Sequence, residues 1–82
     1  EYTMNKINNI GRIIRFHRRK AGLTQKQLAT LAGVGKSAVF DIEKGKITIR
    51  LNTLTAILSV LNISLKPESP LMDQWSREEH LP

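Results

Sequence analysis

The chain has 82 residues, with 13 Lys and Arg against 7 Asp and Glu, a net charge of +6 and no cysteine. This length supports one domain with one small core, and the lack of cysteine excludes disulfides and thiolate metal sites. No apolar run approaches the ~20 residues that a membrane-spanning helix needs, and no signal-peptide pattern is present, so the sequence predicts a cytoplasmic protein.

The N-terminal residues are polar, and we expect residues 1–6 to be flexible. Because the chain does not begin with methionine, Met4 is a candidate for the native start. A helix is predicted to follow, capped by Asn8 or Asn9 and ending at Lys20, since apolar side chains recur at helical spacing. Its inner face is predicted to consist of Ile10, Ile14, His17 and Ala21, with Ile13 beside them.

The outer side of this helix is predicted to be basic, because arginines recur at spacings of three and four residues: Arg12, Arg15 and Arg19. Phe16 points away from the core face, so we expect either an exposed side chain or an intermolecular contact. His17 has no second histidine at ligand spacing, and we expect it to be a half-buried packing residue.

The stretch from Thr24 to Gly45 has the pattern of two short helices joined by a tight turn. Thr24 is a good N-cap, and Gln27 three residues later completes a capping box. Gly33 is predicted to end the first helix in a left-handed conformation, and Gly45 to end the second. Such a helix-turn-helix places its second helix in the DNA major groove. The residues expected to face inward are Leu28, Ala29, Leu31, Ala32, Val39 and Ile42.

In this order, the cap, turn, core and exit glycine resemble the lambdoid-repressor (Xre, Cro/C1-type) helix-turn-helix family, and the resemblance covers residues 7–62. The family often pairs an arginine with the glutamate near the end of its recognition helix, which implies an ion pair between Arg18 and Glu43 here. The resemblance is carried by Thr24-Gln25, Leu28-Ala29, Gly33-Val34, Val39 and Ile42-Glu43-Lys44-Gly45.

The resemblance also implies a double-stranded DNA operator as partner, with base contacts from the helix between Gly35 and Lys44. Carry-over from the family points to Lys36, Ser37 and Asp41, and Phe40 also points outward. The acid and the aromatic depart from the amides and hydroxyls that the family favours. Phosphate contacts are expected at the amide end of the preceding helix and from nearby cations, namely Thr24, Gln25, Arg12, Arg15, Arg19, Lys26, Lys44 and Lys46.

A fourth helix is predicted from Leu51 or Asn52 to Leu61, following an extended connection. With it, residues 7–62 form an all-α domain, a compact bundle of four to five short helices. The apolar face of this helix is predicted to contain Leu51, Leu54, Ile57, Leu58 and Leu61.

Residues 63–66 alternate between apolar and polar, which predicts a short strand ended by Pro67. An isolated strand would leave its amides unpaired, so we expect Ile63, Ser64 and Leu65 to pair with the same strand of a second copy in a homodimer. The alternative is an irregular turn packed on the core. The run from Leu61 to Leu65 resembles the HipB-type antitoxin branch of the family, which implies a HipA-like serine/threonine kinase toxin as partner.

Residues 67–82 contain three prolines and four acids, and we expect a flexible acidic tail. Its apolar residues Leu71, Met72 and Trp75 would share one side of a helical turn formed only against a protein partner, which we expect to be the toxin. Alternatively, Trp75 folds back onto its own domain or is merely exposed. The rest of the chain, residues 1–65, carries eleven Lys and Arg against three Asp and Glu, as a DNA-binding body would.

Two functions therefore follow from the sequence: an antitoxin that also represses its own operon as a homodimer, or a stand-alone Xre-type transcriptional regulator without a toxin. We expect no enzyme, because no pair of carboxylates, phosphate-binding loop or nucleophile system is present. We likewise expect no cofactor and no metal.

Overall fold

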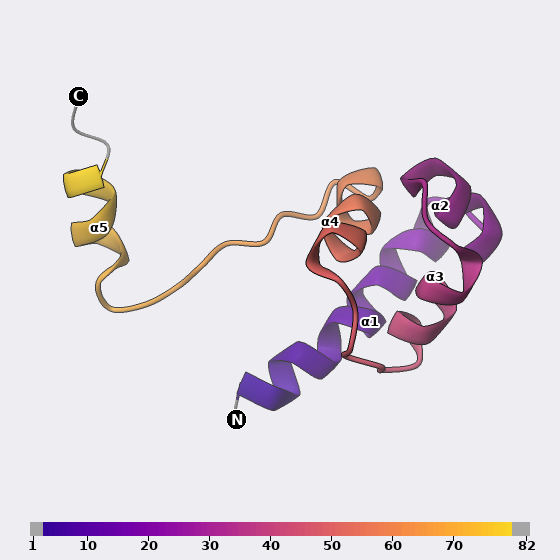
Figure 1. Ribbon diagram of the computed structural model, residues 1–82, viewed down its shortest axis with the longest axis horizontal. Helices are drawn as coiled ribbons and strands as arrows, with labels where there is room; N and C mark the ends of the chain where they lie inside the picture. Colours follow the sequence, from indigo (N-terminus) through magenta and orange to yellow (C-terminus); the bar gives the residue numbers. More distant parts are fainter. Residues whose placement is uncertain (1–2, 80–82) are drawn as a thin grey trace.

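The structure, a computed structural model, describes residues 3–79, with side chains described from residue 9 onward (Figure 1). This part of the chain is helical and contains no strand. The predicted all-α class is therefore confirmed. The helices are α1 (Thr3–Lys20), α2 (Gln25–Ala32), α3 (Lys36–Glu43), α4 (Leu51–Val60) and α5 (Met72–Glu79).

Helix α1 begins earlier than the sequence predicted. It starts at Thr3 rather than at Asn8 or Asn9, so the predicted start of this helix is wrong, while the flexibility of the N-terminal residues stays a prediction. No proline or glycine lies between Thr3 and Gly11, and nothing in this run stops the helix from extending back from its buried part. Residues 1 and 2 lie outside the described residues.

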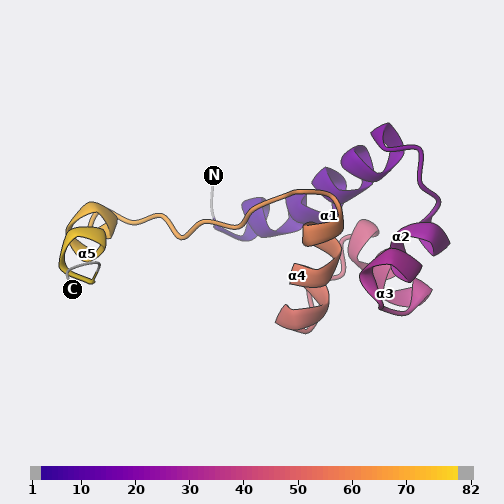
Figure 2. The ribbon, with the colours of Figure 1, turned by 90° about the horizontal axis from the view of Figure 1, so that it is seen from above.

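Helices α1 to α4 form one body around a small apolar core (Figure 2). Helix α2 packs against α3 and α4, and α3 also packs against α1. Each of the four helices therefore contributes to the burial of the others, as a domain of this size requires. The buried apolar side chains of the core are those of Ile14, Leu28, Ala29, Val39, Ile42, Ile57 and Leu58.

Two leucines predicted to face inward lie on the surface instead. Leu31 is 62% exposed, because Leu28 and Ala29 define the inner face of α2 and Ala32 continues it one turn later. Leu51 is 69% exposed, since it opens the first turn of α4 before that helix reaches the core. Phe16 is 58% exposed, as predicted.

Gly11 marks the closest approach of α1 to α3. A Cβ atom built on this glycine would overlap the carbonyl oxygen of Ile42 and would lie 3.0 Å from its carbonyl carbon and 3.3 Å from the Cα of Glu43. The overlap is with backbone, which cannot rotate away as a side chain can. The absence of a side chain at Gly11 therefore sets the distance between these helices.

After α4 the chain forms an irregular connector rather than a strand in this single copy. Asn62 has a left-handed φ of 58°, and the amide of Ile63 donates to the carbonyl of Leu58 at 2.9 Å, an arrangement that closes the end of α4. Ile63 then packs on the core of its own chain. This matches the alternative of a turn packed on the core at Ile63, and residues 63–66 have no strand partner among the described residues.

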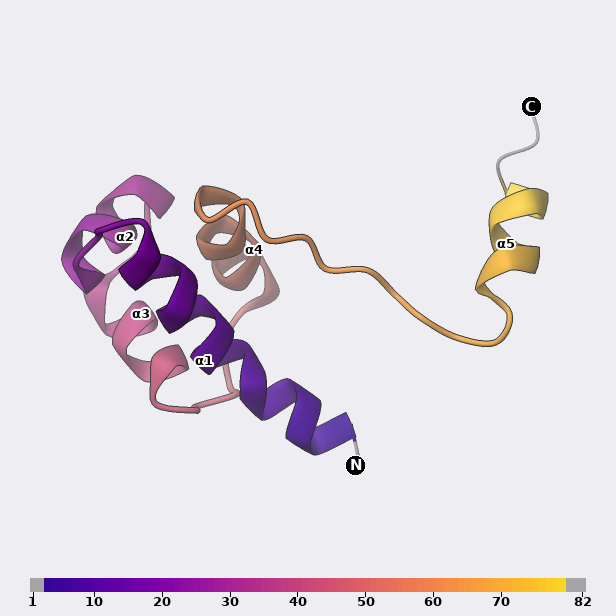
Figure 3. The ribbon, with the colours of Figure 1, turned by 180° about the vertical axis from the view of Figure 1, so that it is seen from behind.

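Helix α5 stands apart from the four-helix body at the end of the connector, as the view from behind also shows (Figure 3). The segment is helical in this single chain, whereas the sequence predicted a helix formed only against a partner; the flexibility of the tail and its partner stay predictions. Local interactions start and support the helix: the Ser69 hydroxyl accepts from the Leu71 amide at 3.2 Å, and Gln74 donates to Glu78 at 3.0 Å. None of its described side chains is buried. Among residues 3–79, no helix is long and apolar enough to cross a membrane.

Candidate nucleic-acid interface

The start of α2 and the turn after it have the predicted geometry. The amide of Gln27 donates to the Thr24 hydroxyl at 3.0 Å, and the amide of Thr24 donates to the Gln27 side chain at 2.8 Å. Gly33 ends α2 with a left-handed φ of 71°. The capping box and the glycine turn are therefore confirmed, and together they fix where α3 begins relative to α2.

The four residues predicted to contact bases lie together on one side of α3. Lys36, Ser37 and Phe40 are exposed, and the Asp41 side chain is 43% exposed. Val39 and Ile42, on the opposite side, are buried in the core. The core thus holds α3 by one face and leaves the other free to enter a groove, an arrangement that suits a recognition helix.

Two lysines after α3 contact this exposed side. The ammonium of Lys44 lies 5.0 Å from the centre of the Phe40 ring, and that of Lys46 lies 3.7 Å from a carboxylate oxygen of Asp41. The sequence assigned Lys44 and Lys46 to phosphates. In the free protein they instead neutralise the acid and cover the aromatic ring that depart from the family pattern.

An ion pair joins the end of α1 to the end of α3, as the family resemblance implied. The Arg18 guanidinium donates to both carboxylate oxygens of Glu43, with Nε–Oε2 2.7 Å and Nη2–Oε1 3.0 Å. The two side chains are only 12% and 4% exposed. Arg18 also donates to the Leu23 carbonyl at 2.8 Å, so the pair also holds the turn that leads into α2. Such bidentate charged hydrogen bonds are among the strongest in proteins.

Gln25 belongs to the same network, which the sequence did not predict. Its side-chain amide donates to Glu43 at 3.1 Å. One amide hydrogen of this candidate phosphate ligand is thus already bound within the protein. The Arg18–Glu43 pair therefore orients Gln25 at the start of α2, beside Thr24 and the exposed Lys26.

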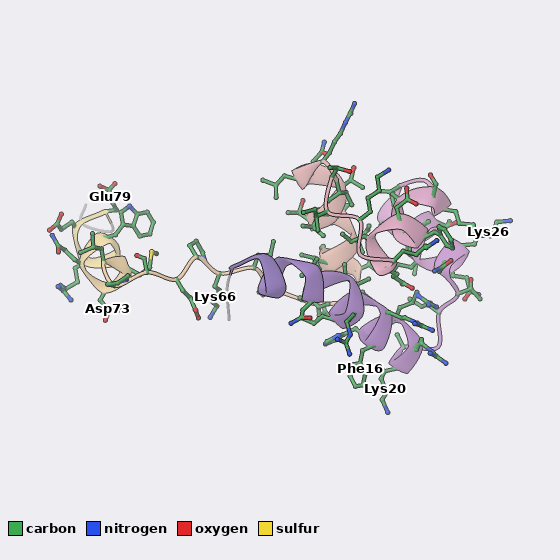
Figure 4. All side chains as sticks on the ribbon, turned by 90° about the horizontal axis from the view of Figure 1, so that it is seen from below. Phe16, Lys20, Lys26, Lys66, Asp73 and Glu79 are labelled. Carbon is green, nitrogen blue, oxygen red and sulfur yellow. The ribbon has the colours of Figure 1, made fainter. Side chains whose placement is uncertain are left out.

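The predicted basic stripe of α1 lies along an open groove of about 560 Å³. Phe16 and Lys20 project from α1 on the side away from α2, α3 and α4 (Figure 4). Phosphate-contact candidates thus fall into separate groups on α1, at the start of α2 and after α3. The groove on α1, which we call the α1 groove, is lined by Arg12, Arg15, Phe16, Arg19, Lys20 and Glu43.

Residues after α3 extend the exposed face in a way that the sequence did not reveal. A hollow of about 250 Å³ joins Ser37 and Asp41 to Thr48, Arg50 and Thr53. Only the charge of Arg50, directly before α4, was a signal in the sequence. The described residues contain no group of three or more His, Asp or Glu side chains that could hold a metal ion.

A capped helix, a left-handed glycine turn and a second helix with one buried and one exposed face define a helix-turn-helix protein. The chain belongs to this family: the family model described as Helix-turn-helix matches residues 14–67. The match includes all of α2, α3 and α4 and the C-terminal part of α1.

Several bacterial proteins are similar to the chain over this region. The uncharacterized HTH-type transcriptional regulator y4mF of Sinorhizobium fredii is 34% identical over 62 residues, which are 76% of this chain and 82% of that protein. The HTH-type transcriptional regulator PuuR of Escherichia coli is 36% identical over 58 residues, 65% of this chain but only 31% of PuuR. A regulator of Haemophilus influenzae is 42% identical over 48 residues, 58% of this chain and 49% of that protein.

Proposed function

We propose that the protein is a sequence-specific DNA-binding transcriptional repressor that acts as a homodimer. The observation that carries this proposal is the exposed side of α3, held by its buried face on a correctly capped helix-turn-helix. The names of the relatives, which are transcriptional regulators, support the same function. We also expect the protein to have no catalytic activity.

Phosphates would be bound by the cations around α3 and by the start of α2. Lys26, Lys44 and Lys46 are exposed, and the N-terminal end of α2 favours an anion because its dipole and free amides point outward. Each phosphate neutralised adds ~0.9 to the logarithmic dependence of affinity on salt. Affinity for any DNA should therefore fall steeply as salt rises.

Bases would be read by the exposed side of α3. Lys36 can donate to guanine O6 or N7, and Ser37 can bond several base edges. If Lys46 moves to a phosphate, the carboxylate of Asp41 is free to accept from cytosine N4. Phe40, 45% exposed, can contact a thymine methyl group.

We expect selection from random double-stranded DNA to enrich one sequence with two-fold symmetry. Its half-sites should lie ~34 Å apart, one helical turn, or a multiple of it, because a symmetric dimer presents two copies of α3. The measurement is sequencing of bound DNA after several rounds at two salt concentrations. Binding without any enriched sequence would contradict base reading and leave only non-specific attraction.

The homodimer is proposed to form through residues 63–66, where Ile63, Ser64 and Leu65 of two copies would pair as strands. Leu65 is 51% exposed and lines an open hollow of about 440 Å³ with residues of α4. A second copy would cover this apolar surface and satisfy the amides of the connector.

Replacing Leu65 with lysine is therefore expected to shift the protein from dimer to monomer, because two buried charges would meet across the two-fold axis. Analytical ultracentrifugation over a range of concentrations measures this shift. The matched control is Leu51→Lys, at a leucine that is 69% exposed and lies at the other end of α4. A Leu65→Lys variant as dimeric as the control would exclude this interface.

We further propose that the repressor is the antitoxin of a HipA-like serine/threonine kinase. The resemblance of residues 61–65 to the HipB-type branch supports this role, and α5 offers a surface for a partner in Leu71, Met72 and Trp75. Leu71 is 65% exposed and Trp75 is 52% exposed. The alternative is a stand-alone Xre-type regulator. A neighbouring gene for such a kinase, whose product co-purifies with this protein, would favour the antitoxin; its absence would favour the stand-alone regulator.

A further inference from the structure

Helix α5 exposes an aromatic residue followed by two acids. Trp75 is 52% exposed, and Glu78 and Glu79 follow it at three and four residues, so they lie one turn further along the same side. Both acids lie in the last turn of the helix, where the negative end of the helix dipole disfavours them. A cationic surface would therefore stabilise this end of α5.

The α1 groove carries the complementary pattern. Phe16 is 58% exposed, and Arg19 and Lys20 follow it at the same spacing of three and four residues. Around the ring, the His17 imidazole meets Phe16 edge-on at 5.6 Å, and the Lys20 ammonium lies 5.7 Å from its centre. Glu43 also lines the groove, but its carboxylate is already bound by Arg18 and Gln25.

We propose that α5 of one copy docks in the α1 groove of a second copy. With the two helices parallel, Trp75 meets Phe16, and Glu78 and Glu79 meet Arg19 and Lys20. Buried aromatic residues are common anchors of interfaces, and complementary charges set the register of the two partners.

The view with side chains supports a second copy as the source of α5. Asp73 and Glu79 lie beyond the connector, well apart from Phe16 and Lys20 on the helical body (Figure 4). The connector thus presents α5 outward, away from the α1 groove of its own chain. Another apolar hollow, about 580 Å³ beside Leu23 and Leu31, has Lys26 as its one cation and cannot match two acids.

One consequence rests on the proposed function. Arg15 and Arg19 are candidate phosphate ligands, and α5 docked in the α1 groove would cover them. Docking and DNA binding would then compete, and a protein partner that captures α5 would release these arginines. The docking itself is measured without DNA, so it can fail while the proposed function holds, and the reverse is also true.

The test uses the fluorescence of Trp75, the only tryptophan of the chain. In the full-length protein, its emission should shift to shorter wavelength as concentration rises, because the indole moves from water into the interface. The variants Arg19→Glu/Lys20→Glu and Glu78→Lys/Glu79→Lys should each need at least about tenfold higher concentration for this shift. Glu68→Lys, on the connector, is the control and should resemble the original chain.

Mixing the two charge-reversed variants should restore the shift at the original concentration, since the acidic groove of one then meets the basic α5 of the other. Only docking between copies gives this result. Emission that stays the same from concentrations at which ultracentrifugation finds monomers to those at which it finds dimers would overturn the proposal, because α5 would then be free or docked on its own chain. Charge-reversed variants that behave like the original chain, or a mixture that fails to recover, would overturn it as well.

Discussion

Replacing Gly11 with alanine is expected to destabilise the domain by about 3 kcal/mol, near the upper end of what overpacking usually costs. The added methyl group would overlap the backbone carbonyl of Ile42, so α1 and α3 would have to separate. Separation would also loosen the core at Ile14 and Ile42, both buried. A domain of this size has only roughly 4–12 kcal/mol of stability, so a large part would be lost.

Urea denaturation followed by circular dichroism measures this loss. The matched control is Gly22→Ala, the same substitution at a glycine with a φ of 75° and no atom within 4 Å of the new Cβ. Gly22→Ala should lower the free energy of unfolding by about 1–2 kcal/mol, because alanine disfavours the left-handed backbone conformation at this position. In an uncrowded helix, replacing glycine with alanine increases stability by about 1 kcal/mol, so a loss at position 11 would come from the overlap with α3. A Gly11→Ala variant as stable as the original chain would show that α1 and α3 do not meet as closely as described.

Replacing Arg18 with methionine is expected to cost about 3–5 kcal/mol, because it leaves the carboxylate of Glu43 buried without its cation. The Glu43 side chain is 4% exposed and would keep only the Gln25 amide as a partner. Joint replacement of Arg18 by methionine and Glu43 by leucine should recover much of the loss, since an apolar pair needs no compensation.

The control for this prediction lies on α3, the helix that also carries Glu43. Asp41→Asn breaks the exposed contact with Lys46, at 3.7 Å, and should change stability by no more than about 0.5 kcal/mol. The comparison separates a buried ion pair from an exposed one by the same denaturation measurement. If Arg18→Met costs no more than Asp41→Asn, the pair does not hold α1 to α3.

The helix-turn-helix could be predicted because its signals are local. Thr24 and Gln27 interact within one turn, and Gly33 requires no distant contact to adopt its left-handed conformation. The Arg18–Glu43 pair joins residues 25 positions apart, and only the family resemblance indicated it.

Other features depend on tertiary packing that a single sequence does not display. Gly11 resembles any tolerated helix glycine until α3 is placed against it. Leu31 has the helical spacing of a core residue, yet Leu28 and Ala32 already fill that side of α2. Gln25 binds Glu43 only because the turn brings the start of α2 to the end of α3.

Helix α5 is the one element whose local signals were present but not used. Ser69 precedes Pro70, a pair typical of an N-cap followed by the first helical position, and Asp73 falls in the first turn. The prolines and acids of this segment instead suggested a flexible tail. For this helix, the positions of Ser69, Pro70 and Asp73 were thus more informative than the overall content of proline and acidic residues.

The central claim is that the exposed side of α3 reads the bases of DNA. The most direct measurement compares the affinity of the double variant Lys36→Ala/Ser37→Ala for the selected DNA sequence and for random DNA. Loss of good base contacts should cost about 1–3 kcal/mol each on the selected sequence and little on random DNA. Arg15→Ala, in contrast, should weaken both alike and lower the salt dependence by ~0.9. A double variant that selects the same sequence with unchanged affinity would contradict the assignment of α3 as the recognition helix.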